Sequence, residues 1–565
     1  MPRRFPAARL VLAALLTFSA FAGAGCSLFS RMSGSSDDLH ARRNTPAADA
    51  PIARFAFEDF GTLNTHTLET YAVPWKLYTT ALLMSEAPRL GLPVERASLR
   101  PVLEQYGFLF PDSIGNWDAS AGPMPHPEPL GSTRGTIDNW TPWLKLEVHN
   151  TGCATCHGGR LYDADGRPTR TAWLGLPNTW IDLESYTQAT YAALKLALRD
   201  EHGLEETMRR VYPEMSWGER WVTKHGVMPR VRKALKTLAA GRDRALVFDN
   251  GGPGLANGVA SLKFQLGIIS QKDYAPGEMA IASIPDLSDR ALRSSLLYDG
   301  TYAVRGDPHF RVMSRDSVPA DGITHFAPIA AFFTVTTSGN APATAEQMIP
   351  RMREALRAVA AYSAPPFPGA LDHALATRGS EVFARRCSGC HGRYDTSAPR
   401  PRLIVYPNAL VSQDRIGTDP VRWMGVDSTV LHWQDAHATH PFVKHVDTQR
   451  TGGYVPPILG GVWATAPYLH NGSIPTLWAL MHPEQRPARF AVGGHRLDYR
   501  RVGIALAAEP DSDGVWRYPR DYTPGSRPVV YDTSKLGRGN GGHEMPFRNM
   551  SEDEKSAVVE FLKTL

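Results

Sequence analysis

The sequence predicts a mainly α-helical chain of two domains with long inserted loops, the first domain being heavily extended. Its 565 residues are enough for about two to four domains, and 42% hydrophobic with 21% charged residues is typical of a soluble globular chain. A proline-rich stretch at 363–369 stops the helical pattern of 352–362, so we divide the chain into 51–362 and 370–565. One five-residue pattern occurs once in each part.

That pattern is C-x-x-C-H, which reads CATCH at 153–157 and CSGCH at 387–391. Two thiols three residues apart can each form a thioether with a vinyl group of haem, and the adjacent histidine can bind the iron. Structural zinc sites are the alternative, but they usually gather their ligands over short loops, whereas 234 residues separate the two pairs of cysteines. We therefore expect two covalently bound c-type haems. Their attachment residues would be Cys153, Cys156, His157, Cys387, Cys390 and His391.

The N-terminus, residues 1–25, is interpreted as an export signal. Arginines precede an apolar run at 10–21, and small residues follow it. The run is too short to span a bilayer, which takes about 20 apolar residues. Cys26 is then expected to be the lipid-modified first residue of a mature lipoprotein, although Gly23 stands where an aliphatic residue is usual. Cleavage after Ala24, which leaves Cys26 as a free thiol, is the alternative. Either route places the protein in the periplasm or cell envelope, where haem is attached to C-x-x-C-H.

Residues 26–50 are polar and are expected to form a flexible tether between the membrane and the fold. No later segment is predicted to form a transmembrane helix. The net charge of +5 is mild for this length and gives no reason to expect nucleic-acid binding. The Lys/Arg-rich stretch 224–244 is interpreted as a solvated helix face, with docking of an acidic redox partner as the alternative.

The second domain is predicted to open and close with helices that cross. The first covers 371–386 and places Gly379 and Phe383 on one face, one turn apart. The last covers 551–565, begins with a capping box at Ser551, and carries an apolar stripe. The stripe consists of Val558, Val559, Phe561, Leu562 and Leu565. The spacing G-x-x-x-F-x-x-x-C-x-x-C-H together with this helix pair resembles the class I cytochrome c fold.

The first domain lacks that glycine–aromatic spacing, because residues 143–148 precede Cys153 instead. It is also much larger than one cytochrome domain. We expect a haem-bearing helical core here, with extra helices and loops and few strands.

The sixth ligand of each iron decides what the haem can do. An iron with a side chain on both faces mainly passes electrons, whereas an open face can bind dioxygen or peroxide. For the haem of His391 the candidate distal ligands are His543, Met545 and His470. The first two lie in the glycine-rich segment 537–545 just before the last helix, and such a segment can approach a flat ring closely.

The segment 455–473 (VPPILGGVWATAPYLHNGS) resembles an element of bacterial di-haem cytochrome c peroxidases. The fuller context is closer to one branch of that superfamily, the rubber-oxygenase and fatty-acid dioxygenase-like di-haem proteins. The resemblance covers roughly residues 140 to 565. Further shared elements lie at 416–420, 475–477, 486–490 and 542–544.

The resemblance implies roles for individual residues. His543 takes the place of the distal ligand of the second haem, and bis-His ligation would lower its potential relative to His/Met. Tyr298 stands where the family has a Trp beside the reactive haem, so Tyr298 and His157 are the catalytic candidates. The peroxidases carry a catalytic Glu about twenty residues later, but 301–325 contain no Glu. Glu278 is followed by Met279 but precedes Tyr298, so that role is not transferred to it.

This pattern favours an exported di-haem oxidoreductase that activates dioxygen, or peroxide, at the haem of His157. The second haem, between His391 and His543, would carry electrons. Two alternatives remain: a cytochrome c peroxidase that reduces hydrogen peroxide, and a non-catalytic electron-transfer protein. The resemblance further implies a small cytochrome or cupredoxin as redox partner, a calcium ion between the domains, and one of the 13 Trp residues between the haems.

Overall fold

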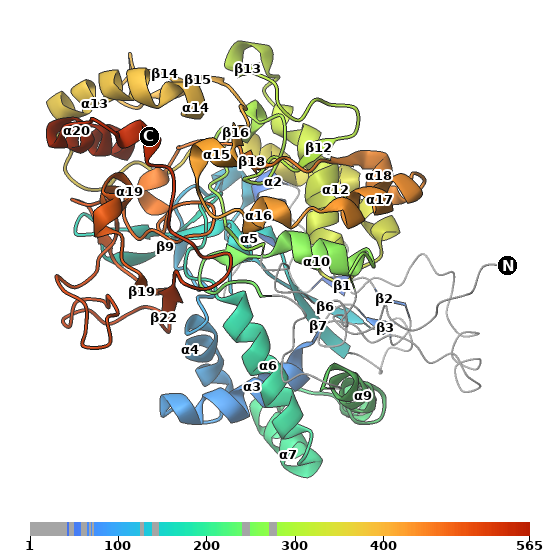
Figure 1. Cartoon of the computed structure of the whole chain (residues 1–565). Coiled ribbons are helices and arrows are strands. Elements are labelled where there is room, and N and C mark those ends of the chain that lie inside the picture. Colours follow the sequence, from blue (N-terminus) through green and yellow to red (C-terminus); the bar gives the residue numbers. More distant parts are fainter. Residues whose placement is uncertain are drawn as a thin grey trace.

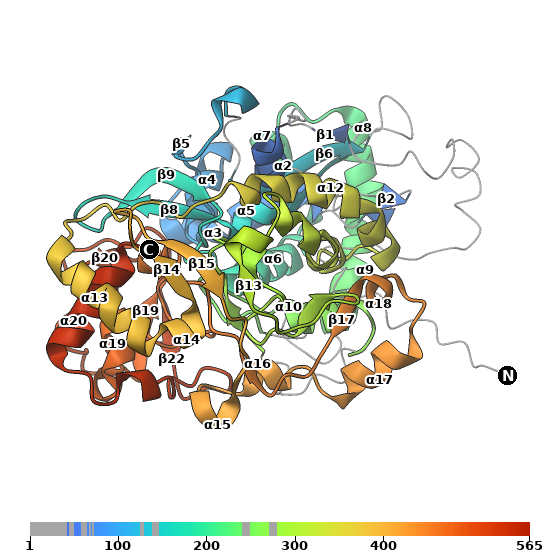
Figure 2. The ribbon, with the colours of Figure 1, turned by 90° about the horizontal axis from the view of Figure 1, so that it is seen from above.

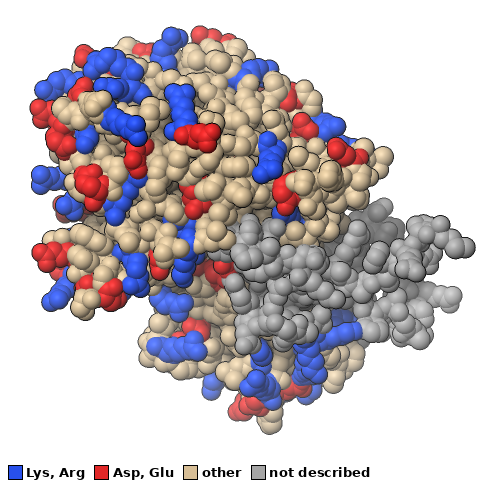
Figure 3. Space-filling model, in the orientation of Figure 1, with Lys and Arg blue, Asp and Glu red and all other residues tan. Residues whose placement is uncertain are grey.

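The computed structural model describes residues 42–43, 50–57, 65–66, 69–70, 73–124, 129–137, 146–239, 249–269 and 280–565. Cys26, Glu278 and Met279 lie outside these ranges, as do most of the expected tether and residues 240–244 of the basic stretch. Helices make up 43% of the structure and strands 14%, as a mainly α-helical chain requires (Figure 1). No helix in the described ranges is long and apolar enough to cross a membrane. Basic and acidic side chains are interspersed over the face shown in Figure 3.

The C-terminal half begins and ends with two helices that lie side by side in both ribbon views (Figures 1 and 2). They are α13 (His373–Arg386) and α20 (Glu552–Lys563), and both the capping box at Ser551 and the buried apolar stripe are confirmed. A Cβ at Gly379 would overlap the backbone carbonyl of Ala557. Only glycine therefore allows α20 to cross α13 this closely.

Between these helices the chain forms short elements joined by long loops. The helices are α14 (Ser388–His391), α15 (Gln413–Ile416), α16 (Val421–Met424), α17 (Ser428–Ala436), α18 (Pro441–His445) and α19 (Leu477–Met481). The strands are β14 (Arg393–Asp395), β15 (Arg402–Tyr406), β16 (Val411–Ser412), β17 (Val446–Thr448), β18 (Gly453–Tyr454), β19 (Arg489–Val492), β20 (Leu497–Asp498), β21 (Gly503–Ile504) and β22 (Val529–Asp532).

A second helix pair of the same kind lies in the N-terminal half. The helix α2 (Pro51–Phe57) packs against both α12 (Pro342–Ala360) and α5 (Cys153–Cys156). In the same way, α13 packs against both α20 and α14 in the C-terminal half. The sequence did not reveal it, because α2 ends at Phe57 and a long insertion separates it from Cys153, whereas α13 runs directly into Cys387.

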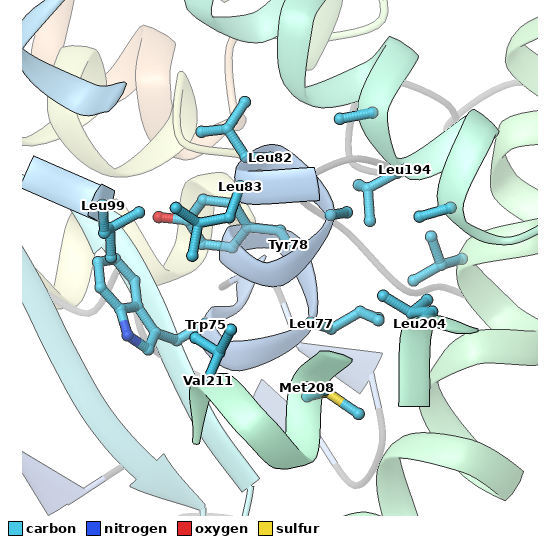
Figure 4. Close-up of a cluster of buried hydrophobic side chains, with 14 of the residues drawn as sticks. Trp75, Leu77, Tyr78, Leu82, Leu83, Leu99, Leu194, Leu204, Met208 and Val211 are labelled. Carbon is cyan, nitrogen blue, oxygen red and sulfur yellow. The ribbon is translucent and has the colours of Figure 1, made fainter. Parts of the chain in front are cut away.

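Two helices of this insertion and four helices that follow α5 in the sequence form a helical lobe, which lies at the bottom of Figure 1. Its helices are α3 (Trp75–Glu86), α4 (Leu99–Glu104), α6 (Leu183–Ala197), α7 (Glu201–Val211), α8 (Trp217–Val222) and α9 (Met228–Ala239). Figure 4 shows side chains of α3 meeting those of α6 and α7 in a buried cluster that includes Leu77, Leu194 and Leu204. The lobe therefore has a hydrophobic core of its own.

Strands are more numerous in the N-terminal half than we expected, and the residues just before Cys153 form a strand. A four-stranded sheet has the order β1-β6-β7-β4, and a three-stranded sheet the order β5-β9-β8. The strands of this half are β1 (Arg42–Arg43), β2 (Thr65–His66), β3 (Glu69–Thr70), β4 (Val73–Pro74), β5 (Ser113–Ile114), β6 (Ser132–Ile137), β7 (Leu146–Thr151), β8 (Gly158–Tyr162), β9 (Pro168–Leu174), β10 (Leu255–Ala256), β11 (Ala282–Ser283), β12 (Tyr302–Val304) and β13 (Met313–Ser314). The two remaining helices are α10 (Gly258–Gln265) and α11 (Ala327–Ala331).

The two halves interleave. β12 pairs with β17, and β13 pairs with β15, so two small sheets contain strands from both sides of the proline-rich break. The break itself has no helix or strand, and the indole nitrogens of Trp173 and Trp463 donate to the carbonyls of Ser363 and Pro365. These contacts tie 363–369 to both halves of the chain.

Candidate functional site

His391 and His543 face each other across a cavity in the C-terminal half. Their ring centres are 6.0 Å apart, with an angle of 62° between the ring planes. Metal–imidazole bonds are about 2.0 Å long, so two imidazoles on opposite faces of one iron have ring centres roughly 6 Å apart. The pair therefore fits one iron ion held from both sides.

The protonation of both rings suits metal binding. The Nδ1 of His391 lies 2.9 Å from the carbonyl oxygen of Pro457, to which it donates in the neutral tautomer that leaves Nε2 free. Burial lowers the pKa of His391. Burial, then the neighbouring His391 and Arg486, lower the pKa of His543 to about 3. Both imidazoles are thus neutral near pH 7, as ligands must be.

The loop that carries His543 is held by elements far away in the sequence. The backbone N–H of His543 donates to the carbonyl of Ile416 at 2.7 Å, and the N–H of Gly539 donates to the carboxylate of Asp419 at 2.9 Å. The Asn471 amide donates to the carbonyls of Gly537 and Gly539. His543 itself has φ +55°, a conformation that costs energy for a side chain with a Cβ and persists here because these contacts fix it.

The cavity has a volume of about 490 Å³. It contains both cysteines of the second C-x-x-C-H pattern, and its other walls are largely apolar. The apolar lining includes Phe383, Val411, Ile416, Pro457, Leu459, Val462, Leu477, Leu480, Met481, Phe547, Val558 and Leu562. A flat, largely apolar group attached to Cys387 and Cys390 fits this donor set and this lining.

The two other candidate distal ligands lie differently. His470 lines the cavity, but its ring stacks on Tyr454 at 4.3 Å, and its Nε2 is 3.1 Å from the Tyr454 hydroxyl. Met545 also lines the cavity and is 44% exposed to solvent. Of the three, His543 is the one whose ring opposes His391.

The first C-x-x-C-H pattern forms the short helix α5 and presents His157 to the segment around Pro285. Burial, and to a lesser extent Arg290, lower the pKa of His157, the Pro285 carbonyl raises it, and the result is about 4. The Nδ1 atom makes no hydrogen bond of normal geometry within the described residues. The contact is therefore looser than that of His391 with Pro457, but it involves the same group, a proline carbonyl.

Pro285 and Pro457 belong to two copies of one backbone structure, residues 283–302 and 455–474, whose equivalent residues are 172 positions apart. In each copy a left-handed residue precedes a 3-10 turn. Asp289 (φ +54°) precedes the turn Arg290–Leu292, and Gly461 (φ +66°) precedes the turn Val462–Ala464. The copies thus share both the proline and the turn that follows it.

The same equivalence continues to the end of the segment. Leu297 and Leu469 both have positive φ, +68° and +63°. An isolated antiparallel bridge closes each copy, Leu296 with Tyr302 in the first and Tyr468 with Ile474 in the second. Tyr298 of the first copy therefore occupies the position of His470 in the second.

The two copies contact each other reciprocally. The N–H of Ser283 donates to the carbonyl of His470 at 2.7 Å, and the N–H of the equivalent Val455 donates to the carbonyl of Tyr298, also at 2.7 Å. A Cβ on Gly460 would lie 2.7 Å from the Cβ of Ser288, its own equivalent. The copies are thus related by a local pseudo-twofold axis that passes between His157 and His391.

Tyr298 lies at this junction. Its hydroxyl is 2.8 Å from the hydroxyl of Ser283, burial raises its pKa, and it lines the same cavity as His391. Among the described residues no Trp lines this cavity, whereas three tyrosines do, Tyr298, Tyr454 and Tyr468.

Sequence reasoning missed a buried carboxyl group beside Pro285. Asp286 accepts hydrogen bonds from the Tyr362 hydroxyl at 2.5 Å and from the Ser288 N–H at 2.7 Å. Burial raises its pKa to about 6. No motif marks Asp286, because its partners come from a residue two positions away and from the end of α12.

The loops before the last helix of each half differ. His543 lies eight residues before Ser551, the N-cap of α20. The position eight residues before Ala341, the N-cap of α12, is Phe333, whose ring centre is 5.2 Å from that of Tyr302. The residues 327–336 around Phe333 include no His or Met. The nearest preceding histidine, His325, is half exposed and bonds to Asp307.

The described residues hold no group of three or more His, Cys, Asp or Glu side chains placed to bind a metal ion. No cluster of acidic side chains marks a site for the expected calcium ion within these residues, and calcium binding stays a prediction.

Comparisons with known proteins agree with the haem interpretation of the C-terminal half. A family described as RoxA-like, cytochrome c-like matches residues 453–491, which include the whole second copy of the repeated segment. Two uncharacterized proteins of Sinorhizobium fredii, y4iJ and y4iM, are 28% identical over 255 residues and 33% identical over 215 residues. The matches cover 35% and 34% of this chain and 40% and 44% of those proteins, so the chain spans less than half the length of either relative. The region around 453–491 is thus a cytochrome c-like domain similar to the RoxA-like family, and a haem cofactor is implied by it.

Proposed function

We propose that this chain is an exported di-haem c-type oxidoreductase that activates dioxygen, or peroxide, at the haem attached to Cys153 and Cys156. The haem between His391 and His543 serves as the electron-transfer centre. The two haem domains would be 51–362 and 370–565, and the protein would lie in the periplasm or cell envelope, tethered to a membrane through Cys26.

One observation carries the proposal, the difference between the two distal loops. The segments that face His157 and His391 follow the same backbone path, but the residue eight positions before the N-cap of the last helix is His543 in one half and Phe333, in the π-helical turn Phe332–Thr336, in the other. A ligand on both faces suits electron transfer, whereas an apolar group in place of the sixth ligand leaves an iron able to bind a small molecule.

The described residues around Phe333 support chemistry on an apolar substrate. Phe326 and Phe332 are fully buried near it, and Tyr302 packs against its ring. These aromatic side chains exclude water, and of the three only Tyr302 carries a group that can hydrogen-bond, so they favour an apolar, unsaturated molecule next to the bound oxidant. The haem supplies the iron that binds and activates the oxidant.

Peroxide reduction is the second candidate, and Asp286 is the observation that favours it. This buried carboxyl lies beside Pro285 and has a pKa of about 6, so it could deliver a proton during O–O cleavage in place of the glutamate that 301–325 lack. A small cytochrome or cupredoxin would then supply the electrons.

Absorption and EPR spectra of the purified holoprotein test the proposal. We expect one low-spin haem that does not respond to added cyanide or peroxide, and one haem that binds both. Turnover is then compared for an unsaturated apolar substrate under dioxygen and for peroxide with a small electron donor. Brisk peroxide reduction that is unaffected by Tyr298→Phe and abolished by Asp286→Asn would assign the peroxidase function. Two low-spin haems that exclude cyanide would instead indicate a pure electron-transfer protein.

A further inference from the structure

The outer face of α8 exposes two tryptophans. Trp217 is 65% exposed and Trp221 is 44% exposed, and they are the only Trp residues among the large exposed hydrophobic side chains of the described residues. Four residues separate them, so they lie on one face of the helix. The ring of His225 continues this face, with its centre 5.3 Å from that of Trp221.

The inner face of α8 is fixed by the lobe and does not need these rings. Val222 is buried, and the carboxylate of Glu219 binds the ammonium of Lys76 on α3 at 2.8 Å. The fold thus holds α8 from the inside and leaves two large aromatic side chains in solvent. Exposed pairs of this kind mark interaction sites more often than they mark folding needs.

The surroundings of the two rings are basic. The stretch 217–239, which forms α8, the π-helical turn Thr223–Val227 and α9, contains six Lys or Arg residues and one acidic residue, the buried Glu219. Its net charge of +5 equals that of the whole chain. Two of the cations are paired with α7, Lys224 with Glu205 at 2.7 Å and Arg232 with Glu201. Figure 3 shows basic side chains over this lobe, below the grey atoms.

The lobe lies close to the point where the N-terminal segment joins the fold. The first described residues, Arg42 and Arg43, form β1, which pairs with β6, and β6 pairs with β7. Lys76 bridges this sheet to α8, because its ammonium also lies 3.4 Å from the Glu147 carboxylate on β7. Arg42 lies sixteen positions after Cys26, and a chain of that length spans at most roughly 55 Å. An anchor on Cys26 would therefore keep α8 within reach of the same membrane.

We propose that the outer face of α8 and α9, with Trp217 and Trp221 at its centre, docks on the surface of an anionic lipid bilayer. Indole rings partition to the boundary between headgroups and acyl chains, and Lys and Arg are attracted to anionic headgroups. This docking is independent of the proposed catalytic function.

Vesicle binding tests the proposal on the full-length holoprotein with Cys26→Ser, which removes the lipid anchor. The probe is a phosphatidylcholine vesicle with or without phosphatidylglycerol. We expect binding to the anionic vesicles with a blue shift of Trp fluorescence, weakening with added salt. Trp217→Ser/Trp221→Ser should weaken binding at least several-fold, and Lys236→Gln should weaken it on anionic vesicles alone.

Val312→Ser is the matched control, because Val312 is also 65% exposed but lies outside the lobe. It should bind like the parent, and the haem absorption spectrum should be unchanged in every variant. Failure of the parent to bind anionic vesicles, or equal binding by the double Trp variant, would overturn the proposal. Loss of binding to an acidic redox protein in the double Trp variant, with vesicle binding unchanged, would also overturn it and assign the face to that partner.

Discussion

The segment that faces His157 and the segment that faces His391 follow one backbone path, but the loops that close the two sites differ. In both copies a proline carbonyl faces a histidine, and within each copy a left-handed residue and a 3-10 turn follow that proline. Before the last helix, however, a loop with three hydrogen-bonded anchors carries His543 in one half, whereas the same count of residues from the last helix gives Phe333, in a π-helical turn, in the other. The comparison teaches that the histidine side of each site is a repeated structure and that the segments before the last helix of each half are not.

The largest expected effect comes from removing the attachment residues of one site. Cys153→Ser/Cys156→Ser should lower the intact mass by one haem and leave the spectrum of the bis-His haem. Cys387→Ser/Cys390→Ser should also lower the intact mass by one haem, but should leave the spectrum of the haem attached to Cys153 and Cys156. Mass spectrometry after acid–acetone extraction measures the covalent haem in each. If either double variant kept two covalent haems, the two sites would not be separate.

Substitutions at His543 and Phe333 should change the spin states of the two haem irons in opposite directions. His543→Ala removes one of two axial ligands and should convert the low-spin EPR signal of the second haem to high spin. Phe333→His should convert the open haem to low spin and block cyanide binding. His470→Ala is the control, because His470 bonds to Tyr454 and does not oppose His391. Unchanged EPR spectra in His543→Ala would exclude it as a ligand.

The close crossing of α13 and α20 should be sensitive to a single methyl group. A Cβ at Gly379 overlaps the Ala557 carbonyl, so Gly379→Ala must push the helices apart. Overpacking of this kind costs about 1–3 kcal/mol or more. A lower midpoint of thermal unfolding measures the effect, and Arg378→Ala serves as control because Arg378 is an exposed residue of the same helix. Equal midpoints for the two variants would contradict the packing argument.

An effect of similar size, confined to one range of pH, concerns the charge of Asp286. Its pKa of about 6 in the folded protein is raised above the usual 3.8, so the native state binds the extra proton. The free energy of unfolding should therefore be highest below about pH 4 and fall as pH rises through 6, by up to about 3 kcal/mol. Asp286→Asn should remove this dependence, so the stability of wild type relative to the variant should decline between pH 4 and 7. A constant difference in denaturation midpoints over that range would show that Asp286 does not titrate there.

The contrast between the two halves explains what could be predicted. In the C-terminal half the helix with Gly379 and Phe383 runs directly into Cys387. The spacing of these three residues therefore predicts how this helix and the C-x-x-C-H pattern lie together. In the N-terminal half the equivalent helix α2 ends at Phe57, far from Cys153 in sequence, and no spacing pattern remains. The strand β7 before Cys153 was missed for the same reason, because its partners are β4 and β6 in a sheet assembled over a long insertion.

The sequence by itself determined the two C-x-x-C-H patterns, the capping box at Ser551 and the buried stripe of the last helix, and it led to the prediction of His543 as a ligand. These depend on residues a few positions apart or on a resemblance carried by short motifs. Only the tertiary structure placed Pro285 beside His157, paired α2 with α12, related the two repeated segments by a pseudo-twofold axis and buried Asp286. Those features arise from contacts between residues far apart in the chain, and such contacts are fixed by packing and hydrogen bonding that no local pattern records.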